Sequence, residues 1–317
     1  LLQFRPPRHA LNPRTAHLAR TVYGAMAPRV VLTGSVMLWP RADAVAAELI
    51  LDLCAMTLVP GTPYGTVQVR RRVLTEMEAA WHGEVVRGFA EFVGRGWRGV
   101  GGEEDKEASF LLELHAATPG KLWRLSRELP STGLRERAAR VLRRYGELGM
   151  GELPGQWRAG RRPLPFTLNH GDVVPGNLLV DERTGRLNGL VDWAEAEVGI
   201  WGLGLYGLEF LLGYGKSVGA RGADYTFTYY AQAPELRKSF WEEVKRGIGS
   251  EFERPEAQEA VAVIRDVGVL LWFGYAWDEG QIDRVVNERD DPREMLLLRT
   301  FLGLEEGENR GSEKARL

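Results

Sequence analysis

The chain has 317 residues and a single cysteine, Cys54. One cysteine excludes an internal disulfide, and it favours a reducing, intracellular compartment over a disulfide-rich secreted fold. Because Cys54 lies in an apolar run, we expect a buried thiol rather than a reactive one.

Long apolar runs are also missing. Apolar stretches such as the segment 200–214 are interrupted by glycines and Glu209, and none reaches the ~20 residues that cross a bilayer. The sequence shows no signal peptide pattern, so we expect a cytoplasmic protein without a membrane partner. The chain begins at Leu1 rather than at a methionine, which is interpreted as a sign of a fragment or an incomplete gene model.

The chain has no excess of charge of either sign. Its 41 Lys and Arg residues nearly balance 43 Asp and Glu residues, giving a formal net charge of -2. This balance gives no electrostatic case for binding nucleic acid or an anionic membrane. With 44% hydrophobic residues, the chain can instead bury the core of one large or two modest globular domains.

The most informative segment is residues 166–193, FTLNHGDVVPGNLLVDERTGRLNGLVDW. Its first residues, 166–168, form a short β-prone run that ends before His170 and Gly171, which places Asp172 in a loop. Residues 178–180 and 187–191 indicate two strands joined by a tight turn. This hairpin is expected to return Asp192 to the side of Asn177 and Asp172.

Two carboxylates and an amide oxygen that converge in this way suit a hard cation such as Mg²⁺. Asp172 and Asn177 are five residues apart, as are the Asp and Asn of the protein kinase catalytic loop. An isolated His-Gly-Asp is more often a surface turn. Here the asparagine, the hairpin and the Val-Asp-Trp ending together favour a catalytic site.

The motifs HGDVVPGNLLV (170–180) and GLVDWAEAEVG (189–199) resemble the aminoglycoside phosphotransferase and choline kinase group, which are small-molecule relatives of the protein kinases. The Asp-Trp-Ala-Glu-Ala-Glu continuation resembles a large set of such proteins from fungi. The resemblance implies that Asp172 is the catalytic base, that His170 braces its loop, and that Asn177 and Asp192 hold Mg²⁺. It also implies ATP as cofactor and a small-molecule hydroxyl as acceptor.

The fold implied by this resemblance is α+β, a protein kinase-like two-lobed fold with a truncated small β lobe and a mainly α-helical large lobe. We expect residues 1–60 to form the partial nucleotide-binding lobe and hinge, residues 61–303 the catalytic and substrate lobe, and residues 304–317 a disordered tail. In the resembled fold the hinge backbone holds the adenine ring. We place it at residues 57–61, with Thr57, Val59 and Gly61 as cofactor-binding positions.

The chain departs from the family pattern in its first 60 residues. Arg5 stands where the family has a Lys or Arg on its third strand, although a solvated strand end is an equally good interpretation. The helix expected at 13–26 contains no Asp or Glu, so the usual ion pair of kinases cannot form. No Gly-rich phosphate loop precedes the hinge, and the glycines of 94–102 indicate a surface loop instead.

Hydrophobic periodicity, together with the glycines and prolines that interrupt it, predicts the remaining helices and strands. His115 is expected to be packed, and Trp272, Trp277 and Asp278 to belong to the core more than to a pocket. Glu195 and Glu197 are interpreted as bracing or solvated carboxylates in a segment, 194–199, that turns back to the catalytic loop. We expect strands at 1–5, 30–38 and 49–59, helices at 13–26, 67–92, 104–117, 133–147, 203–213, 235–247, 256–275 and 291–303, and a polar connection at 151–163.

Three functions follow. The first is an ATP- and Mg²⁺-dependent phosphotransferase acting on a small-molecule hydroxyl. The second is a pseudokinase that binds a nucleotide or a protein without transferring phosphate, which the missing phosphate loop and helix acid favour. The third is a metal-dependent phosphohydrolase, which needs further His or Asp ligands than the five scattered histidines offer.

Overall fold

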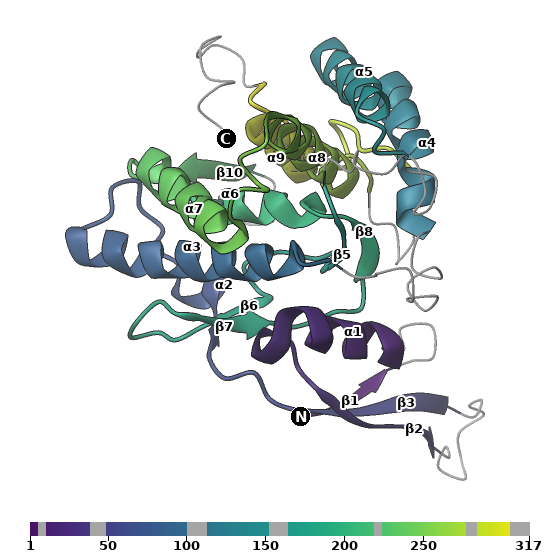
Figure 1. Ribbon diagram of the computed structural model, residues 1–317, viewed down its shortest axis with the longest axis vertical. Helices are drawn as coiled ribbons and strands as arrows, with labels where there is room; N and C mark the ends of the chain where they lie inside the picture. Colours follow the sequence, from purple (N-terminus) through teal and green to yellow (C-terminus); the bar gives the residue numbers. More distant parts are fainter. Residues whose placement is uncertain are drawn as a thin grey trace.

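The computed structural model describes residues 1–5, 11–38, 49–99, 113–151, 164–218, 224–276 and 284–304. A small sheet and one helix stand at one end of the molecule, and the other helices gather at the opposite end (Figure 1). Between the two lies a pair of short sheets that carry residues 166–200. This arrangement is the two-lobed α+β architecture expected from the sequence.

The small lobe is an antiparallel sheet of three strands in the order β1-β3-β2. Strand β1 (Leu2–Arg5) pairs with β3 (Leu49–Met56) so that Arg5 lies opposite Asp52, and β2 (Val30–Leu38) pairs with the other edge of β3. Helix α1 (Pro13–Tyr23) follows β1, with Asn12 accepting the N–H of Arg14 as its cap. A 3₁₀ turn, η2 (Gly24–Met26), ends it.

Two short sheets join the lobes. Strand β4 (Thr62–Pro63) pairs with β6 (Leu178–Val180), which pairs with β7 (Leu187–Leu190), while β5 (Phe166–Asn169) pairs with β8 (Glu197–Ile200). Every residue of β5 and β6 is buried, including the polar Thr167 and Asn169 of β5. The loops at their ends therefore start from fixed positions.

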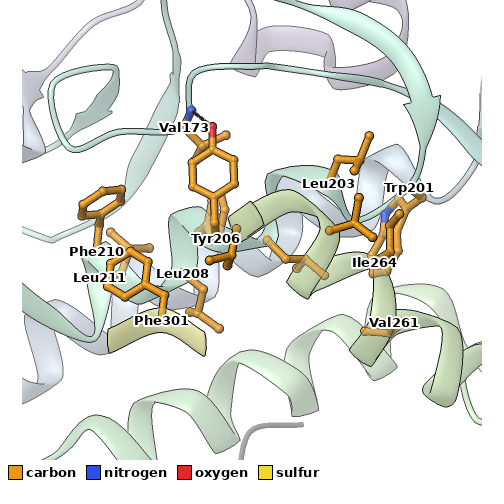
Figure 2. Close-up of a cluster of buried hydrophobic side chains, with 14 of the residues drawn as sticks. Val173, Trp201, Leu203, Tyr206, Leu208, Phe210, Leu211, Val261, Ile264 and Phe301 are labelled. Carbon is orange, nitrogen blue, oxygen red and sulfur yellow. Dashed lines mark hydrogen bonds between the residues drawn. The ribbon is translucent and has the colours of Figure 1, made fainter. Parts of the chain in front are cut away.

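The large lobe is mainly helical. Helix α3 (Glu76–Gly96) packs along α7 (Ala233–Ile248), while α5 (Thr132–Glu147) packs on α4 (Glu113–Glu128) and on α8 (Pro255–Phe273). Helix α9 (Pro292–Leu302) packs on α8 and on strand β10 (Asp224–Tyr229). Figure 2 shows part of the core they share, in which Phe210 and Phe301 approach each other and Trp201 lies near Ile264.

A buried ion pair fixes the centre of this lobe. The carboxylate of Glu209 is 1% exposed, and both of its oxygens accept from the guanidinium of Arg237 at 2.8 Å. Burial alone raises the pKa of Glu209, but Arg237 and Arg265 outweigh it and lower the value to about 2. The pair therefore holds α6 (Gly207–Leu211) to α7 as a charged, hydrogen-bonded contact.

Most expected elements are confirmed, with shifted ends. The strands at 1–5, 30–38, 166–168, 178–180 and 187–191 and the helices at 13–26, 133–147, 235–247, 256–275 and 291–303 are all present within a few residues. His115 is buried against Phe166, Trp272 stacks on Tyr206, and Cys54 is buried, as expected. The boundary near residue 60 stays a prediction.

Five expectations were wrong. The helix at 67–92 is a short α2 (Tyr64–Val67) followed by α3, because the Thr75–Glu78 capping box starts a helix at residue 76. Residues 94–96 belong to α3 rather than to a loop, and the strand at 49–59 stops at Met56. The helix at 104–117 continues to Glu128 across Pro119. The helix at 203–213 is the 3₁₀ turn η4 (Leu203–Tyr206) and the short α6.

A hairpin that the sequence did not indicate follows α6, formed by β9 (Gly213–Val218) and β10 (Asp224–Tyr229). Several expectations concern residues outside the described ranges. They are the start of the helix at 104–117, the loop residues 100–102, nearly all of the connection at 151–163, Trp277, Asp278, and the tail beyond Leu304.

Candidate active site

The loop between β5 and β6, residues 170–177, is held by His170. The Nε2 of His170 lies 2.9 Å from the carbonyl oxygen of Val191, and its Nδ1 accepts the backbone N–H of Asp172 at 3.2 Å. Both contacts require a neutral ring with the proton on Nε2. Burial favours the same state, since it lowers the pKa of His170 to about 4. His170 thus ties the loop to the end of β7.

Asp172 and Asn177 are in direct contact. The Nδ2 of Asn177 donates to Oδ2 of Asp172 at 2.8 Å and to its carbonyl oxygen at 3.0 Å. This leaves the Oδ1 of Asn177 as an acceptor for another group. Burial raises the pKa of Asp172 to about 6, and the negative charges of Asp192 and Glu195 add to that effect against the hydrogen bond from Asn177.

The hairpin returns Asp192 to this pair. The N–H of Val191 donates to the carbonyl oxygen of Asn177 at 3.0 Å, so the residue before Asp192 is bonded to the loop. Asp192 itself has a φ of 63°, and it is the one non-glycine residue in the left-handed region within the described ranges. Such a conformation costs ~1–3 kcal/mol and persists where the surrounding structure enforces it. The strained residue is therefore the one whose carboxylate is proposed to hold a metal.

Arg5 reaches the same carboxylate from the small lobe. Its Nη2 lies 3.0 Å from Oδ1 of Asp192. The structure therefore brings together four of the residues singled out in the sequence, namely Arg5, Asp172, Asn177 and Asp192.

A cavity of about 370 Å³ opens between the lobes beside this group. Arg5, Asn177 and Asp192 line it on one side, and the segment after β3 lines it on the other with Thr57 and Val59. The N–H of Thr57 donates to the carbonyl oxygen of Arg29, whereas the N–H of Val59 has no partner among the residues that the structure describes. The walls of the cavity also include apolar side chains from α1 and β6, namely Ala16, Ala19 and Leu179.

Gly61 does not line this cavity. It has a φ of 125°, and a Cβ at this position would lie 2.7 Å from the carbonyl oxygen of Val180. Close approach to β6 therefore explains the glycine without a nucleotide. Its role in cofactor binding stays a prediction.

Tyr206 braces the loop, a role that the sequence did not indicate. Its hydroxyl donates to the carbonyl oxygen of Gly171 at 3.2 Å and accepts the N–H of Val173 at 2.9 Å, the bond drawn in Figure 2. The sequence offered no signal beyond a tyrosine in an apolar run, because the contact spans 33 residues. It fixes the two residues on either side of Asp172.

Tyr23 connects α1 to the strand before the loop. Its hydroxyl donates to the carbonyl oxygen of Leu168, and its ring stacks on Phe92 at 4.2 Å between centroids. Trp193, next to Asp192, lies 5.2 Å from the same ring and 4.5 Å from His170. The aromatic contacts thus join the small lobe, the loop and the hairpin.

The donor set at the loop fits a hard divalent cation. Asp172, Asn177 and Asp192 offer carboxylate and amide oxygens, which Mg²⁺ prefers. Within the part of the chain that the structure describes, no group of three or more His, Cys, Asp and Glu side chains is placed to hold a metal. A cation at this loop would therefore take its remaining ligands from water and from a bound phosphate.

A search of the described helices for membrane spans found none long and apolar enough to cross a bilayer. A comparison with curated proteins gave no match.

Solved structures with a similar fold include three phosphotransferases. A choline kinase from Cryptosporidium parvum is 13% identical, with a TM-score of 0.47, over 92% of this chain and 76% of that one. An aminoglycoside phosphotransferase from Streptomyces rimosus, solved with ADP and streptomycin, is 18% identical, with a TM-score of 0.43, over 84% and 85%. An aminoglycoside-3'-phosphotransferase of type VIII is 17% identical, with a TM-score of 0.41, over 81% and 79%.

The model of a phosphotransferase enzyme family matches residues 1–203, which include the small lobe, the catalytic loop and the hairpin with Asp192. The chain therefore belongs to this phosphotransferase family and has its protein kinase-like fold.

Proposed function

We propose that the chain transfers the γ-phosphate of ATP to a hydroxyl of a small molecule, in a reaction that requires Mg²⁺. The observation that carries the proposal is the convergence of Asp172, Asn177 and Asp192 at the edge of a cavity between the lobes. Family membership supports a phosphotransferase, and the geometry of these three residues supports the nucleotide and metal.

Each residue has a distinct role in this proposal. Asp172 orients the acceptor hydroxyl and takes its proton as the hydroxyl oxygen bonds to the γ-phosphorus. The bond from that phosphorus to the bridging oxygen breaks, and ADP leaves. Positioned proton acceptance of this kind contributes ~10²–10⁴-fold in rate. The contact between Asn177 Nδ2 and Asp172 Oδ2 holds the base in place for this step.

Asn177 Oδ1 and the Asp192 carboxylate would hold Mg²⁺. When bound, the cation neutralises charge on the β- and γ-phosphates. Arg5 would then pair with a phosphate in place of Asp192. The adenine ring would lie against the apolar side of the cavity, where the free N–H of Val59 provides a donor for it.

The Arg5–Asp192 ion pair also supports a second candidate. Arg5 forms an ion pair with Asp192, which is one of the two proposed metal ligands. Helix α1 has no acidic residue in its first turn that could pair with Arg5 instead. A pseudokinase that binds nucleotide without transferring phosphate would keep this pair. The phosphohydrolase has no such support, since a two-metal cluster is missing from the described residues.

The test measures the formation of ADP from ATP and Mg²⁺ in the presence of hydroxylated small molecules. The panel contains neutral, cationic and anionic molecules. We expect at least one class to raise ADP release, and the Asp172→Asn variant to reduce that rate by ~10²–10⁴-fold while still binding ATP. Tight Mg²⁺-ATP binding with no ADP formed in the presence of any acceptor would favour the pseudokinase. We place the protein in the cytoplasm, where both ATP and a reduced Cys54 are expected.

A further inference from the structure

A second cavity, of about 630 Å³, lies on the other side of the catalytic loop. Residues 174–176 of the loop form one wall, whereas Asn177, the next residue, lines the cavity between the lobes. The two cavities share no lining residue. The loop that carries Asp172 thus separates a nucleotide-sized space from a second space in the large lobe.

Three cationic side chains line this second cavity, namely Arg70, Lys216 and Arg293. They come from three separate places, the segment after α2, strand β9 and the start of α9. Among the residues that the structure describes, no Asp or Glu lines the cavity. None of the three cations forms an ion pair with a residue in the described ranges, whereas Arg5 in the first cavity is paired.

Two of the three cations, Arg70 and Arg293, act on the ring of Tyr225. The guanidinium of Arg293 lies over the ring of Tyr225, 4.9 Å from its centroid. Burial raises the pKa of Tyr225, while Arg293 and Arg70 both oppose that rise, so both charges are felt at this ring. Glu294 acts on the ring in the opposite direction, but it does not line the cavity.

Hydrogen bonds connect the segment that carries Arg70 to the catalytic loop. The Nη2 of Arg70 donates to the carbonyl oxygen of Gly65 at 3.3 Å, and the N–H of Gly65 donates to the carbonyl oxygen of Pro175 at 2.9 Å. On the opposite wall, Gln68 Nε2 donates to the carbonyl oxygens of Phe210 and Gly213, the residue at which β9 begins. These bonds connect Arg70 to the catalytic loop and the start of β9 to the segment that carries Arg70.

We propose that this cavity binds an anionic group of the acceptor, a carboxylate or a phosphate, and that the substrate is a hydroxylated anion rather than a polycation. Three unpaired cations without a lining carboxylate repel a cationic acceptor and attract an anionic one. Two arginines add the planar, forked donors that suit carboxylate and phosphate oxygens. This inference rests on the proposed function, because it assigns the acceptor to the loop that carries Asp172.

The test measures binding rather than turnover. The cleft between the lobes is filled with Mg²⁺ and a non-hydrolysable ATP analogue, and inorganic phosphate, glycolate and glucosamine are titrated separately, with chemical shifts of the protein as readout. We expect phosphate, glycolate or both to bind with a dissociation constant below ~20 mM, and glucosamine to bind more weakly. Phosphate alone would identify a phosphorylated acceptor, and glycolate alone a carboxylate.

Two variants and a matched control decide whether these cations are responsible. Lys216→Gln and the double change Lys216→Gln with Arg293→Gln should weaken anion binding at least ~10-fold. Lys238→Gln removes another exposed lysine, from α7 and outside this cavity, and should leave binding unchanged. The single variant changes an exposed side chain, so it provides the answer even where the double variant does not fold.

Three results would overturn the proposal. They are anion binding no tighter than ~20 mM, equal weakening by Lys238→Gln and Lys216→Gln, or tighter binding of glucosamine than of both anions. Failure of the proposed function gives a different pattern. In that case anions bind with the expected dependence on Lys216 while Asp172→Asn changes no rate.

Discussion

Arg5 Nη2 lies 3.0 Å from Asp192 Oδ1, so the first strand of the small lobe is joined to the hairpin of the large lobe across 187 residues. Helix α1 has no acidic residue in its first turn. Asp192 is 49% exposed and Arg5 only 19% exposed, and the pair lies at the wall of the interlobe cavity. A cation bound by Asp192 would release Arg5 toward the phosphates of a nucleotide.

The first test changes Arg5 to Gln. Because charge-assisted contacts to phosphate contribute ~1.5–3 kcal/mol, the dissociation constant for Mg²⁺-ATP should rise by ~10–100-fold. Isothermal titration calorimetry measures this directly. Arg29→Gln is the control, since Arg29 is another arginine of the small lobe but is exposed and lies outside the cavity. Equal affinities for all three proteins would show that Arg5 is a solvated strand end.

The second test removes the hydroxyl of Tyr206. In Tyr206→Phe the N–H of Val173 loses its partner, and a buried donor left unpaired costs ~1–3 kcal/mol. We expect that loss in chemical denaturation, together with a kcat reduced by ~10-fold because Asp172 is less well positioned. Tyr275→Phe removes a comparable hydrogen bond, to the carbonyl oxygen of Lys121 at 2.8 Å, far from the loop. Equal effects of the two variants on kcat would refute a bracing role.

The third test compares two glycines of one loop. Gly171 has a φ of 79°, and a Cβ there would lie 2.0 Å from the carbonyl oxygen of Glu195. Gly171→Ala should therefore destabilise the protein by more than ~1 kcal/mol and distort the loop. At Gly176 nothing lies within 4 Å of the added Cβ, so Gly176→Ala should leave the melting temperature unchanged or slightly higher. A tolerated Gly171→Ala would contradict the described loop conformation.

The fourth test concerns pH and His82. This side chain is buried, its Nδ1 lies 3.2 Å from the hydroxyl of Tyr64, and its Nε2 has no partner among the described residues. Burial lowers its pKa from 6.5 to about 4, so the unfolded chain binds its proton more readily than the folded chain between those values. The contribution of His82 to the free energy of unfolding should therefore have its full value above pH 6.5 and decrease as the pH falls toward 4.

His82 accounts for up to about 3 kcal/mol of that fall, from 2.5 pKa units at 1.36 kcal/mol each. Thermal melts at pH 7, 6, 5 and 4 measure this decrease in stability. The stability of His82→Gln should fall less steeply with pH over the same range. A variant slope as steep as that of the wild type would mean that other groups carry the pH dependence.

The catalytic loop could be predicted because its information is local. Asp172, Asn177 and Asp192 are arranged by one loop and one hairpin, and the turn residues and apolar strands specify both. The bracing of that loop could not be predicted. Tyr206 follows in a run that periodicity assigns to a long helix, and the packing of η4 on α8 accompanies the contact of its hydroxyl with Val173.

The hairpin β9–β10 was missed for a similar reason. Residues 213–218 contain two glycines and no alternating apolar pattern, and the strand forms because Tyr225 and Phe227 opposite it pack on the core. The second cavity, in the large lobe, could not be predicted either, since its cationic residues Arg70, Lys216 and Arg293 are far apart in the chain. Contacts over such separations depend on topology and leave no pattern in a single sequence.

The most direct measurement of the central claim is ATP affinity with and without Mg²⁺, in the native chain and in Asp192→Asn. Asparagine tolerates the left-handed backbone at this position, so the variant changes the charge while keeping the conformation. Asp181→Asn, at the turn of the same hairpin, is the matched control. We expect Mg²⁺ to tighten ATP binding at least ~10-fold in the native chain and in Asp181→Asn but not in Asp192→Asn. An identical Mg²⁺ effect in all three proteins would contradict the metal site, and with it the proposed reaction.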